Sequence, residues 1–285
     1  MKKNPVFSIV ISTAGRFDTL ETCLNAIYKY ATFPIEITLI DDATKKEEKV
    51  HHKHLFEYDP EKDVNKNIIS YTTRRHEKQM GFGASYNEGA RGAKAPYLTI
   101  MNDDVKIHEG YFDRVFEVMK DPSISIVGSK LLFPTNSTTR NRPAGKIQHL
   151  GLALDIHANV VHPLIGWSPE NPKTQISREV FAATGALLTI RADIFRAVGG
   201  FDPMYGLGYF EDVDLSLKVR EYYRRTGQVG GRIWVDTLAS GTHYTNATTE
   251  KNPTAFGNQF QENMMKFRSR WASSGLLVYD LFTYG

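Results

Sequence analysis

The stretch 97-YLTIMNDDVKI-107 runs an apolar segment directly into Asn102, Asp103 and Asp104 and then returns to apolar residues. Tyr97–Met101 therefore predicts a buried strand with two adjacent carboxylates at its C-terminal end. Such carboxylates are costly unless a cation lies beside them. A divalent metal shared with substrate phosphates is one explanation. A helix N-cap or an Asx turn is the other, and the stretch alone leaves both open.

The residues around this stretch alternate between apolar strands and amphipathic helices. Val6–Ser12, Thr19–Tyr30 and Ile35–Ile40 predict a strand, a helix and a second, parallel strand. The same alternation continues to Phe133, which predicts a doubly wound sheet. The further expected strands are 68–72, 97–101 and 124–133, and the further helices are 83–93 and 111–120.

Polar clusters follow three of the predicted strands, at Thr13–Arg16, Asp41-Asp42 and Asn102–Asp104. In an open α/β sheet, ligands bind beyond the carboxyl ends of the strands. The three clusters together therefore predict one ligand site at this edge of the sheet.

The second half of the chain is less regular. Its expected features are a polar loop at 134–146, a hairpin or lid at 147–156 and 160–165, helices at 192–198 and 212–226, a strand at 232–235, and a partly helical tail from residue 245. The polar loop and Trp167 are candidates for contact with a second substrate, although Trp167 could equally belong to the core.

Composition limits the class of protein. The chain has 285 residues, is 41% hydrophobic and 24% charged, and carries a formal net charge of +3. These values are ordinary for a globular protein, and no basic tract indicates a nucleic-acid partner. No apolar run approaches ~18 residues, so we expect no transmembrane helix. The single cysteine, Cys23, lies in a helical apolar pattern and suits a reducing cytoplasm.

Acidic residues open a second conspicuous segment, 209-YFEDVDLSLKVR-220, in which Glu211, Asp212 and Asp214 precede an amphipathic helix. Acidic groups at a helix N-terminus complement the macrodipole, which is a sufficient structural explanation. A general base directed into a cleft is the functional alternative. The residues alone do not decide between the two.

Two further patterns are weak by themselves. His243 follows the last predicted strand, and a lone histidine is more often structural than a ligand. The glycines of 79-QMGFGASYNEG-89 lack the Gly-Lys-Ser/Thr ending of a P-loop and follow the third strand rather than the first. His51, His52 and His54 lack metal-ligand spacing and indicate a solvated face.

The order of these segments resembles that of the family 2 glycosyltransferases of GT-A fold, over roughly residues 6–245. The segments that carry the resemblance best are IMNDDV at 100–105, TGALLTIRADIFRAVGGFDP at 184–203, and YFEDVDLSLKVR at 209–220. The nearest likeness is to rhamnosyltransferase-like bacterial members that build surface polysaccharides. The resemblance implies an α/β domain over 1–245 with a mixed sheet flanked by helices. It leaves 246–285 as a helical tail that packs on the domain or on an oligomer partner.

The resemblance also assigns roles toward a nucleotide-sugar. It implies Asp104 and His243 as ligands of Mn²⁺ or Mg²⁺, with Asp103 near the ribose or the metal, and Asn102 stands where many members have Asp. The other residues implied at the nucleotide are Thr13, Arg16, Asp41, Asp42 and the segment from Gly81 to Asn87.

The implied chemistry is inverting transfer of a sugar from a UDP- or dTDP-sugar to a hydroxyl of a glycan or glycolipid. Asp212 matches the catalytic base, Glu211 would orient the acceptor, and Gly185 would floor the sugar site. Two alternatives stay open: a catalytically silent sugar-nucleotide-binding module and a nucleotidyltransferase. Peripheral contact at the inner membrane face and a homodimer through the tail are also open.

Overall fold

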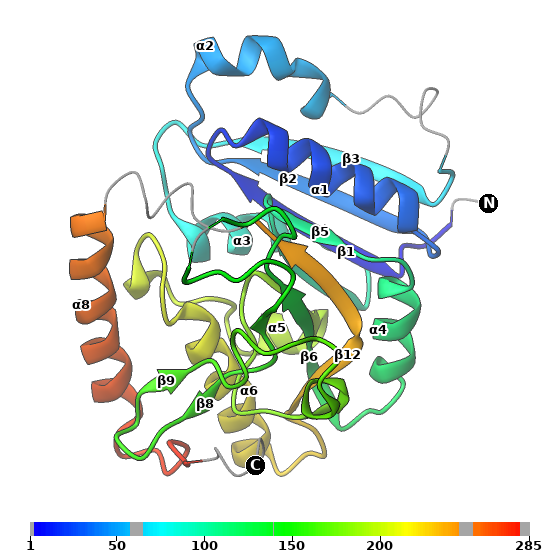
Figure 1. Ribbon diagram of the computed structural model, residues 1–285. Coiled ribbons are helices and arrows are strands. Elements are labelled where there is room, and N and C mark those ends of the chain that lie inside the picture. The colour runs from blue at the N-terminus through cyan, green and yellow to red at the C-terminus, as the bar shows by residue number, and fades with distance from the viewer. Residues whose placement is uncertain (1–2, 58–64, 139, 245–252, 280–285) are drawn as a thin grey trace.

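The computed structural model describes residues 3–57, 65–138, 140–244 and 253–279. Helices cover both faces of a mixed β-sheet with the strand order β10-β12-β6-β11-β4-β1-β2-β3, while β5 pairs with β12 and β7 with β6 (Figure 1). The strands are β1 Phe7–Thr13, β2 Ile35–Asp41, β3 Ile68–Arg75, β4 Tyr97–Asn102, β5 Val105–Ile107, β6 Ile124–Leu132, β7 Ile147–His149, β8 Ala153–Leu154, β9 Val160–Val161, β10 Arg178–Glu179, β11 Leu187–Arg191 and β12 Arg232–His243. The α-helices are α1 Phe17–Tyr30, α2 Lys46–Lys49, α3 Phe82–Ala90, α4 Tyr111–Met119, α5 Ala192–Ala197, α6 Glu211–Thr226 and α8 Pro253–Trp271.

The N-terminal half of the sheet is parallel, as the alternating pattern predicts. β1 pairs with β2 on one side and with β4 on the other, so that Thr13 stands beside Asp41 and Ser12 beside Asn102. The polar ends of β1, β2 and β4 therefore meet at one edge of the sheet, where the sequence predicts a ligand site.

The alternating pattern as far as Phe133 gives strands of one direction, since β4 and β6 both run antiparallel to β11 and hence parallel to each other. β4 and β6 are not neighbours, however, because β11 lies between them. The described residues between β6 and β11 form no α-helix, so no right-handed parallel crossover leads into β11. The mixed sheet flanked by helices that the family resemblance implies is confirmed.

Two buried layers hold the sheet between its helices. On one face, α1 and α4 place side chains such as Leu20 and Phe112 against the strands. On the other face, α3, α5 and α6 contribute Tyr86, Phe195 and Leu215. The period of apolar residues in each helix fits this one-sided burial.

Several element boundaries differ from the predicted ones. Helix α1 begins at Phe17 rather than Thr19, and Phe17 is buried. Strand β12 does not end at Val235 but continues through an irregularity between Asp236 and Ser240 to His243. Strand β5, which the sequence analysis did not predict, pairs with this extension. Three residues after a polar turn carry too little periodicity to be recognised as a strand.

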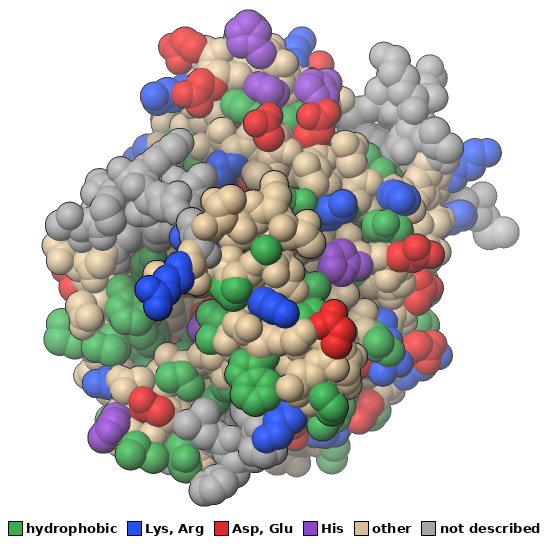
Figure 2. All heavy atoms as spheres, in the orientation of Figure 1, with side chains coloured by type: hydrophobic (Ala, Val, Ile, Leu, Met, Phe, Trp, Pro, Cys, Tyr) green, Lys and Arg blue, Asp and Glu red, His purple; other side chains and the backbone are tan. Residues whose placement is uncertain are grey.

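A third apolar cluster joins α8 to α6. It contains Phe267 and Trp271 from α8 together with Val213 and Leu217 from α6. Figure 2 shows that histidines gather at the top of the molecule, over the segment that begins with α2. His51, His52 and His54 lie there in a 3₁₀ turn at Val50–Leu55, and the described part of the chain contains no cluster of three or more metal-ligating side chains.

Candidate active site

A cleft of about 760 Å³ opens at the carboxyl ends of the parallel strands. Most of the predicted site residues line it, although they come from distant parts of the chain. They are Thr13, Arg16, Asp42, Gly81, Asn102, Asp104, Gly185, Glu211, Asp212 and His243. Asn141 and Arg142 of the expected acceptor loop also line it, whereas Trp167 is exposed outside its lining.

Arg16 is the cation beside the two carboxylates that follow β4. Its Nη1 donates to Asp104 Oδ2 at 2.6 Å, and its guanidinium also bonds both oxygens of Asp103. Arg16 therefore faces the acidic pair rather than Asp41 and Asp42. Asp103 is fully buried under this guanidinium, outside the cleft lining. Charge pairing of this kind offsets much of the cost of burying the carboxylates.

His243 approaches Asp104 from the opposite side. Its Nε2 lies 3.1 Å from Asp104 Oδ1, because β12 pairs with β5 and brings His243 opposite Val105. Burial opposes ionisation of Asp104, but His243 and Arg16 outweigh it and lower the pKa of Asp104 to about 2.

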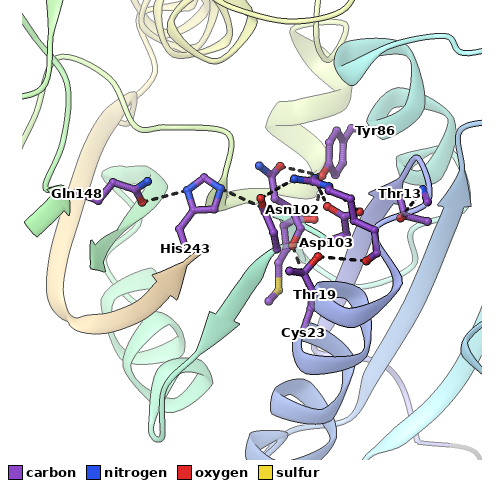
Figure 3. Close-up of polar contacts among 12 residues, drawn as sticks. Thr13, Thr19, Cys23, Tyr86, Asn102, Asp103, Gln148 and His243 are labelled. Atoms are coloured by element: carbon purple, nitrogen blue, oxygen red, sulfur yellow. Dashed lines mark hydrogen bonds and ion pairs between the residues drawn. The ribbon is translucent and has the colours of Figure 1, made fainter. Parts of the chain in front are cut away.

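Gln148 fixes the ring of His243. Its Oε1 lies 3.0 Å from His243 Nδ1 (Figure 3), so Nδ1 carries a proton and donates it to the amide oxygen. Nε2 is the nitrogen directed toward Asp104, so it would offer its lone pair there to a metal when it carries no proton. A hydrogen bond on the far nitrogen is the usual way in which proteins orient a metal-binding imidazole.

Asp104 and His243 together fit a divalent cation. They offer one carboxylate oxygen and one imidazole nitrogen within 3.1 Å of each other. This pair suits Mn²⁺, and Mg²⁺ through the carboxylate, provided that substrate phosphate or water completes the coordination. A closed protein cage is absent from the described residues, which contain no group of three or more such ligands.

The acidic pair at the start of α6 also lines the cleft. Asp212 Oδ2 accepts the N–H of Gly185 at 2.9 Å, and its Oδ1 accepts that of Val213 at 2.8 Å. Each oxygen keeps a lone pair for a substrate hydroxyl. Desolvation raises the pKa of Asp212 above its usual range, although the bonds from these two amides oppose the rise.

Glu211 is 6% exposed, and its Oε2 has no hydrogen-bond partner among the described residues. Desolvation, reinforced by the neighbouring Asp212, raises the pKa of Glu211 to about 8. Glu211 is therefore mainly protonated at neutral pH. An unsatisfied buried carboxyl group at a cleft wall is poised for a ligand hydroxyl.

Asp42 organises the glycine-containing segment before α3. Its carboxylate accepts the N–H groups of Met80 and Gly81 and contacts His76 Nδ1 at 2.7 Å. Desolvation disfavours the His76 cation, but Asp42 and Glu88 on its two nitrogens outweigh this and raise the pKa of His76. Asp42 thus serves both as a cleft wall and as an anchor.

Positions 81 and 185 require glycine because neighbouring atoms lie too close to leave room for a side chain. A Cβ on Gly81 would lie 2.4 Å from the carbonyl oxygen of Gly206, and the backbone of Gly81 has φ +85°. A Cβ on Gly185 would lie 2.7 Å from Phe82 Cζ. Gly185 does line the cleft, but the neighbour that excludes a side chain is Phe82.

Besides Asp103, two predicted nucleotide-binding residues lie outside the cleft lining. Asp41 is fully buried and accepts from Lys49, Arg75 and the N–H of Thr44. Asn87 bridges to the backbone N–H and carbonyl of Phe201. Both side chains hold the walls together, and the structure does not bring them to the cleft.

Cleft residues in β7 and in the segment after β9 were not predicted from the sequence. Gln148, His149 and His162 all line the cleft. The available signal was one glutamine and two histidines within the predicted hairpin. Their positions, 148, 149 and 162, have no spacing typical of a known site. Gln148 and His149 lie in β7, which pairs with β6, whereas His162 follows β9, which pairs with β8.

Comparison with known proteins follows this geometry. The profile described as glycosyl transferase family 2 matches residues 8–193. The O-antigen biosynthesis protein RfbC of Myxococcus xanthus is 24% identical over 228 residues, which are 77% of this chain and 16% of that protein. An uncharacterized protein of Sinorhizobium fredii, y4gI, is also 24% identical, over 77% of this chain and 23% of its own length. The chain thus spans less than a quarter of these curated relatives.

Solved structures share the fold. The crystal structure of GalNAc-T7 with UDP, GalNAc and Mn²⁺ superimposes with a TM-score of 0.62 at 19% identity, over 87% of this chain and 45% of that one. The mannosyltransferase PcManGT of Pyrobaculum calidifontis, in complex with GDP-Man and Mn²⁺, gives a TM-score of 0.57 at 12% identity, over 86% and 59%. No helix within the described residues is long and apolar enough to cross a membrane.

Proposed function

Since the chain belongs to glycosyl transferase family 2, we propose that it transfers a sugar from a nucleotide-diphosphate sugar to a hydroxyl group of an acceptor. The observation that carries the proposal is the meeting of Asp104 and His243 with Asp212 across one cleft. One wall offers a cation site for a diphosphate, and the other offers a carboxylate base. The sugar would lie between them.

The base is needed because a sugar hydroxyl is a weak nucleophile. Asp212 accepts the proton of the attacking acceptor hydroxyl, and Gly185 N–H and Val213 N–H hold its carboxylate in position. Glu211, protonated beside it, is placed to donate to an acceptor oxygen. Attack from this wall, opposite the departing nucleotide, inverts the configuration at the anomeric carbon.

Asp104 and His243 would hold Mn²⁺ or Mg²⁺, which when bound offsets the charge of the departing diphosphate. Arg16 adds a permanent positive charge at the same place. Asn102 and Thr13 line the adjoining cleft, and Asp42 closes the end near the nucleotide. We propose UDP or dTDP as the nucleotide, and a glycan or glycolipid as the acceptor.

A nucleotide panel tests this proposal. The melting temperature is measured with UDP-, dTDP- and GDP-sugars in the presence of Mn²⁺, Mg²⁺ or EDTA, because a ligand of the folded state raises it by mass action. We expect a rise with UDP- or dTDP-sugars that EDTA removes, together with slow release of the nucleotide diphosphate by transfer of the sugar to water. No rise with any nucleotide-sugar would contradict the proposed donor class. A rise without any turnover, with acceptor mixtures present, would favour a silent binding module.

A further inference from the structure

Two histidines contact each other in the wall of the cleft that β7 and the segment after β9 form. His149 Nδ1 and His162 Nδ1 are 3.2 Å apart. His149 is buried, at 1% exposure, whereas His162 is exposed and lines the cleft. His162 Nε2 has no hydrogen-bond partner within the described residues. None of the roles described above uses this pair.

The backbone around His149 fixes where its proton lies. His149 Nε2 faces two N–H donors, those of Gly151 at 3.1 Å and Thr184 at 3.4 Å, so this nitrogen must be an acceptor. Burial also lowers the pKa of His149 well below its ordinary value, so the ring is neutral. A neutral imidazole carries one proton, which therefore lies on Nδ1.

The position of the proton on His149 determines which nitrogen of His162 carries a proton. Because His149 Nδ1–H donates to His162 Nδ1, that nitrogen of His162 must also be an acceptor. A protonated His162 would set two N–H groups against each other at 3.2 Å. His162 is thus held neutral, with its only proton on Nε2.

Two adjacent backbone amides link the histidine pair to the proposed base, Asp212. Thr184 N–H holds His149, and the next residue, Gly185, donates its N–H to Asp212. Adjacent amides of one segment therefore orient the histidine pair and the base. Leu152 and Val160 also line the cleft, as do Arg16 and Asp104, to which we assign the nucleotide.

We propose that His162 is a specificity-determining residue that donates Nε2–H to an oxygen of the acceptor sugar, and that His149 is the residue that positions it. This inference rests on the proposed function for the identity of the acceptor. A fixed neutral donor suits a hydroxyl or ring oxygen, because it pairs without placing a charge beside Glu211 and Asp212. Apolar walls with a few fixed polar groups are typical of such subsites.

The first arm of the test does not depend on catalysis. Long-range ¹H–¹⁵N correlation spectra of histidine-labelled protein at pH 7.5 identify the protonated nitrogen of each ring. His162→Gln assigns the His162 signals by their loss. We expect the Nε2–H form for His162 and the Nδ1–H form for His149. An Nδ1–H form or a doubly protonated ring at His162 would overturn the proposal.

The second arm measures transfer with the donor identified by the nucleotide panel and with methyl glycosides as acceptors. His162→Phe keeps an aromatic ring but removes the N–H, and His162→Gln keeps an N–H donor. We expect His162→Phe to raise the acceptor KM about tenfold, the equivalent of one hydrogen bond. His162→Gln should recover most of this loss. Nucleotide affinity should stay unchanged in both variants, whereas the melting temperature of His162→Phe should fall, because the buried His149 Nδ1–H loses its acceptor.

An unchanged acceptor KM in His162→Phe, or an equal loss of nucleotide affinity, would overturn the role of His162. If no nucleotide-sugar supports turnover in the unmodified protein, the proposed function fails and the acceptor assignment fails with it. The spectra then still decide whether the two histidines hold the proton arrangement that the geometry requires. The two failures are therefore distinguishable.

Discussion

Arg16 Nη1 lies 2.6 Å from Asp104 Oδ2, so a side chain of the protein already neutralises the carboxylate to which we assign a metal. The second oxygen of Asp104 faces His243. Arg16 therefore pairs with both carboxylates after β4, while Asp104 Oδ1 has no hydrogen-bond partner among the described residues. We propose that a metal bound there serves the substrate diphosphate rather than the stability of the fold.

This relationship predicts how metal affects stability. EDTA should leave the melting temperature of the ligand-free protein unchanged. In Arg16→Gln, Asp103 and Asp104 lose their guanidinium, and Mn²⁺ should then raise the melting temperature by more than it does in the unmodified protein. Differential scanning fluorimetry with and without Mn²⁺ measures both effects. Equal Mn²⁺ shifts in the two proteins would show that Arg16 does not compete for these carboxylates.

Asp212→Asn tests the proposed base. The amide can still accept from Gly185 N–H, so the geometry of the wall is largely kept, but it cannot take a proton. We expect sugar transfer to fall by about 10²- to 10⁴-fold, while the nucleotide-dependent thermal shift is retained. Asp193→Asn, on the exposed first turn of α5, is the matched control. Transfer at the unmodified rate in Asp212→Asn would remove this residue from the mechanism.

The raised pKa of Glu211 predicts that the free energy of unfolding falls as the pH rises. Its folded-state pKa of about 8 lies above the ordinary 4.5. Between these values the folded state binds a proton that the unfolded state releases, so the free energy of unfolding decreases as the pH rises from 4.5 to 8. Glu211→Gln cannot ionise and should flatten this slope. Urea midpoints from pH 5 to 9 measure it, and identical slopes in both proteins would argue against a protonated Glu211.

Helix α8 supports the segment that leads into Glu211. Asn263 is fully buried, and its Nδ2 donates to the carbonyls of Tyr205 at 2.8 Å and Gly208 at 2.7 Å. Asn263→Ala leaves these carbonyls unsatisfied and should lower the free energy of unfolding by about 1–3 kcal/mol. Asn258→Ala, exposed on the same helix, should have little effect. Equal denaturation midpoints for the two variants would contradict a supporting role for α8.

The parallel half of the sheet was predictable because its information is local. Val6–Ser12 and Ile35–Ile40 are apolar runs on either side of a regular helical pattern, and such a unit has one favoured topology. Asp104 and Asp212 were recognised as candidates from local sequence as well. Asp104 belongs to a pair of carboxylates that follows an apolar strand, and Asp212 lies in the acidic first turn of a helix. The antiparallel insertion of β11 is non-local, since it depends on partners more than 50 residues away in β4 and β6.

The orientation of side chains was not predictable from local patterns. Arg16 was expected at the nucleotide, but the carboxylates that it meets could not be predicted. β2 and β4 both flank β1, and the sequence does not tell which of the two neighbours the side chain contacts. The histidines at 149 and 162 belong to two separate segments, β7 and the stretch after β9, and meet only in the folded chain. Local periodicity carries no information on such contacts.

Gln148 offers a sharp test of the metal site, because its amide oxygen contacts His243. Its amide oxygen holds His243 Nδ1–H at 3.0 Å and leaves Nε2 directed toward Asp104. Gln148→Leu removes this bond with little change in volume, and Gln148→Glu keeps an acceptor. Loss of such a bond typically weakens metal affinity 10- to 100-fold. We therefore expect Mn²⁺ titrations in the presence of UDP, followed by electron paramagnetic resonance, to show weaker binding in Gln148→Leu and near-normal binding in Gln148→Glu. If both variants bind Mn²⁺ as the unmodified protein does, His243 is not a ligand whose orientation depends on Gln148.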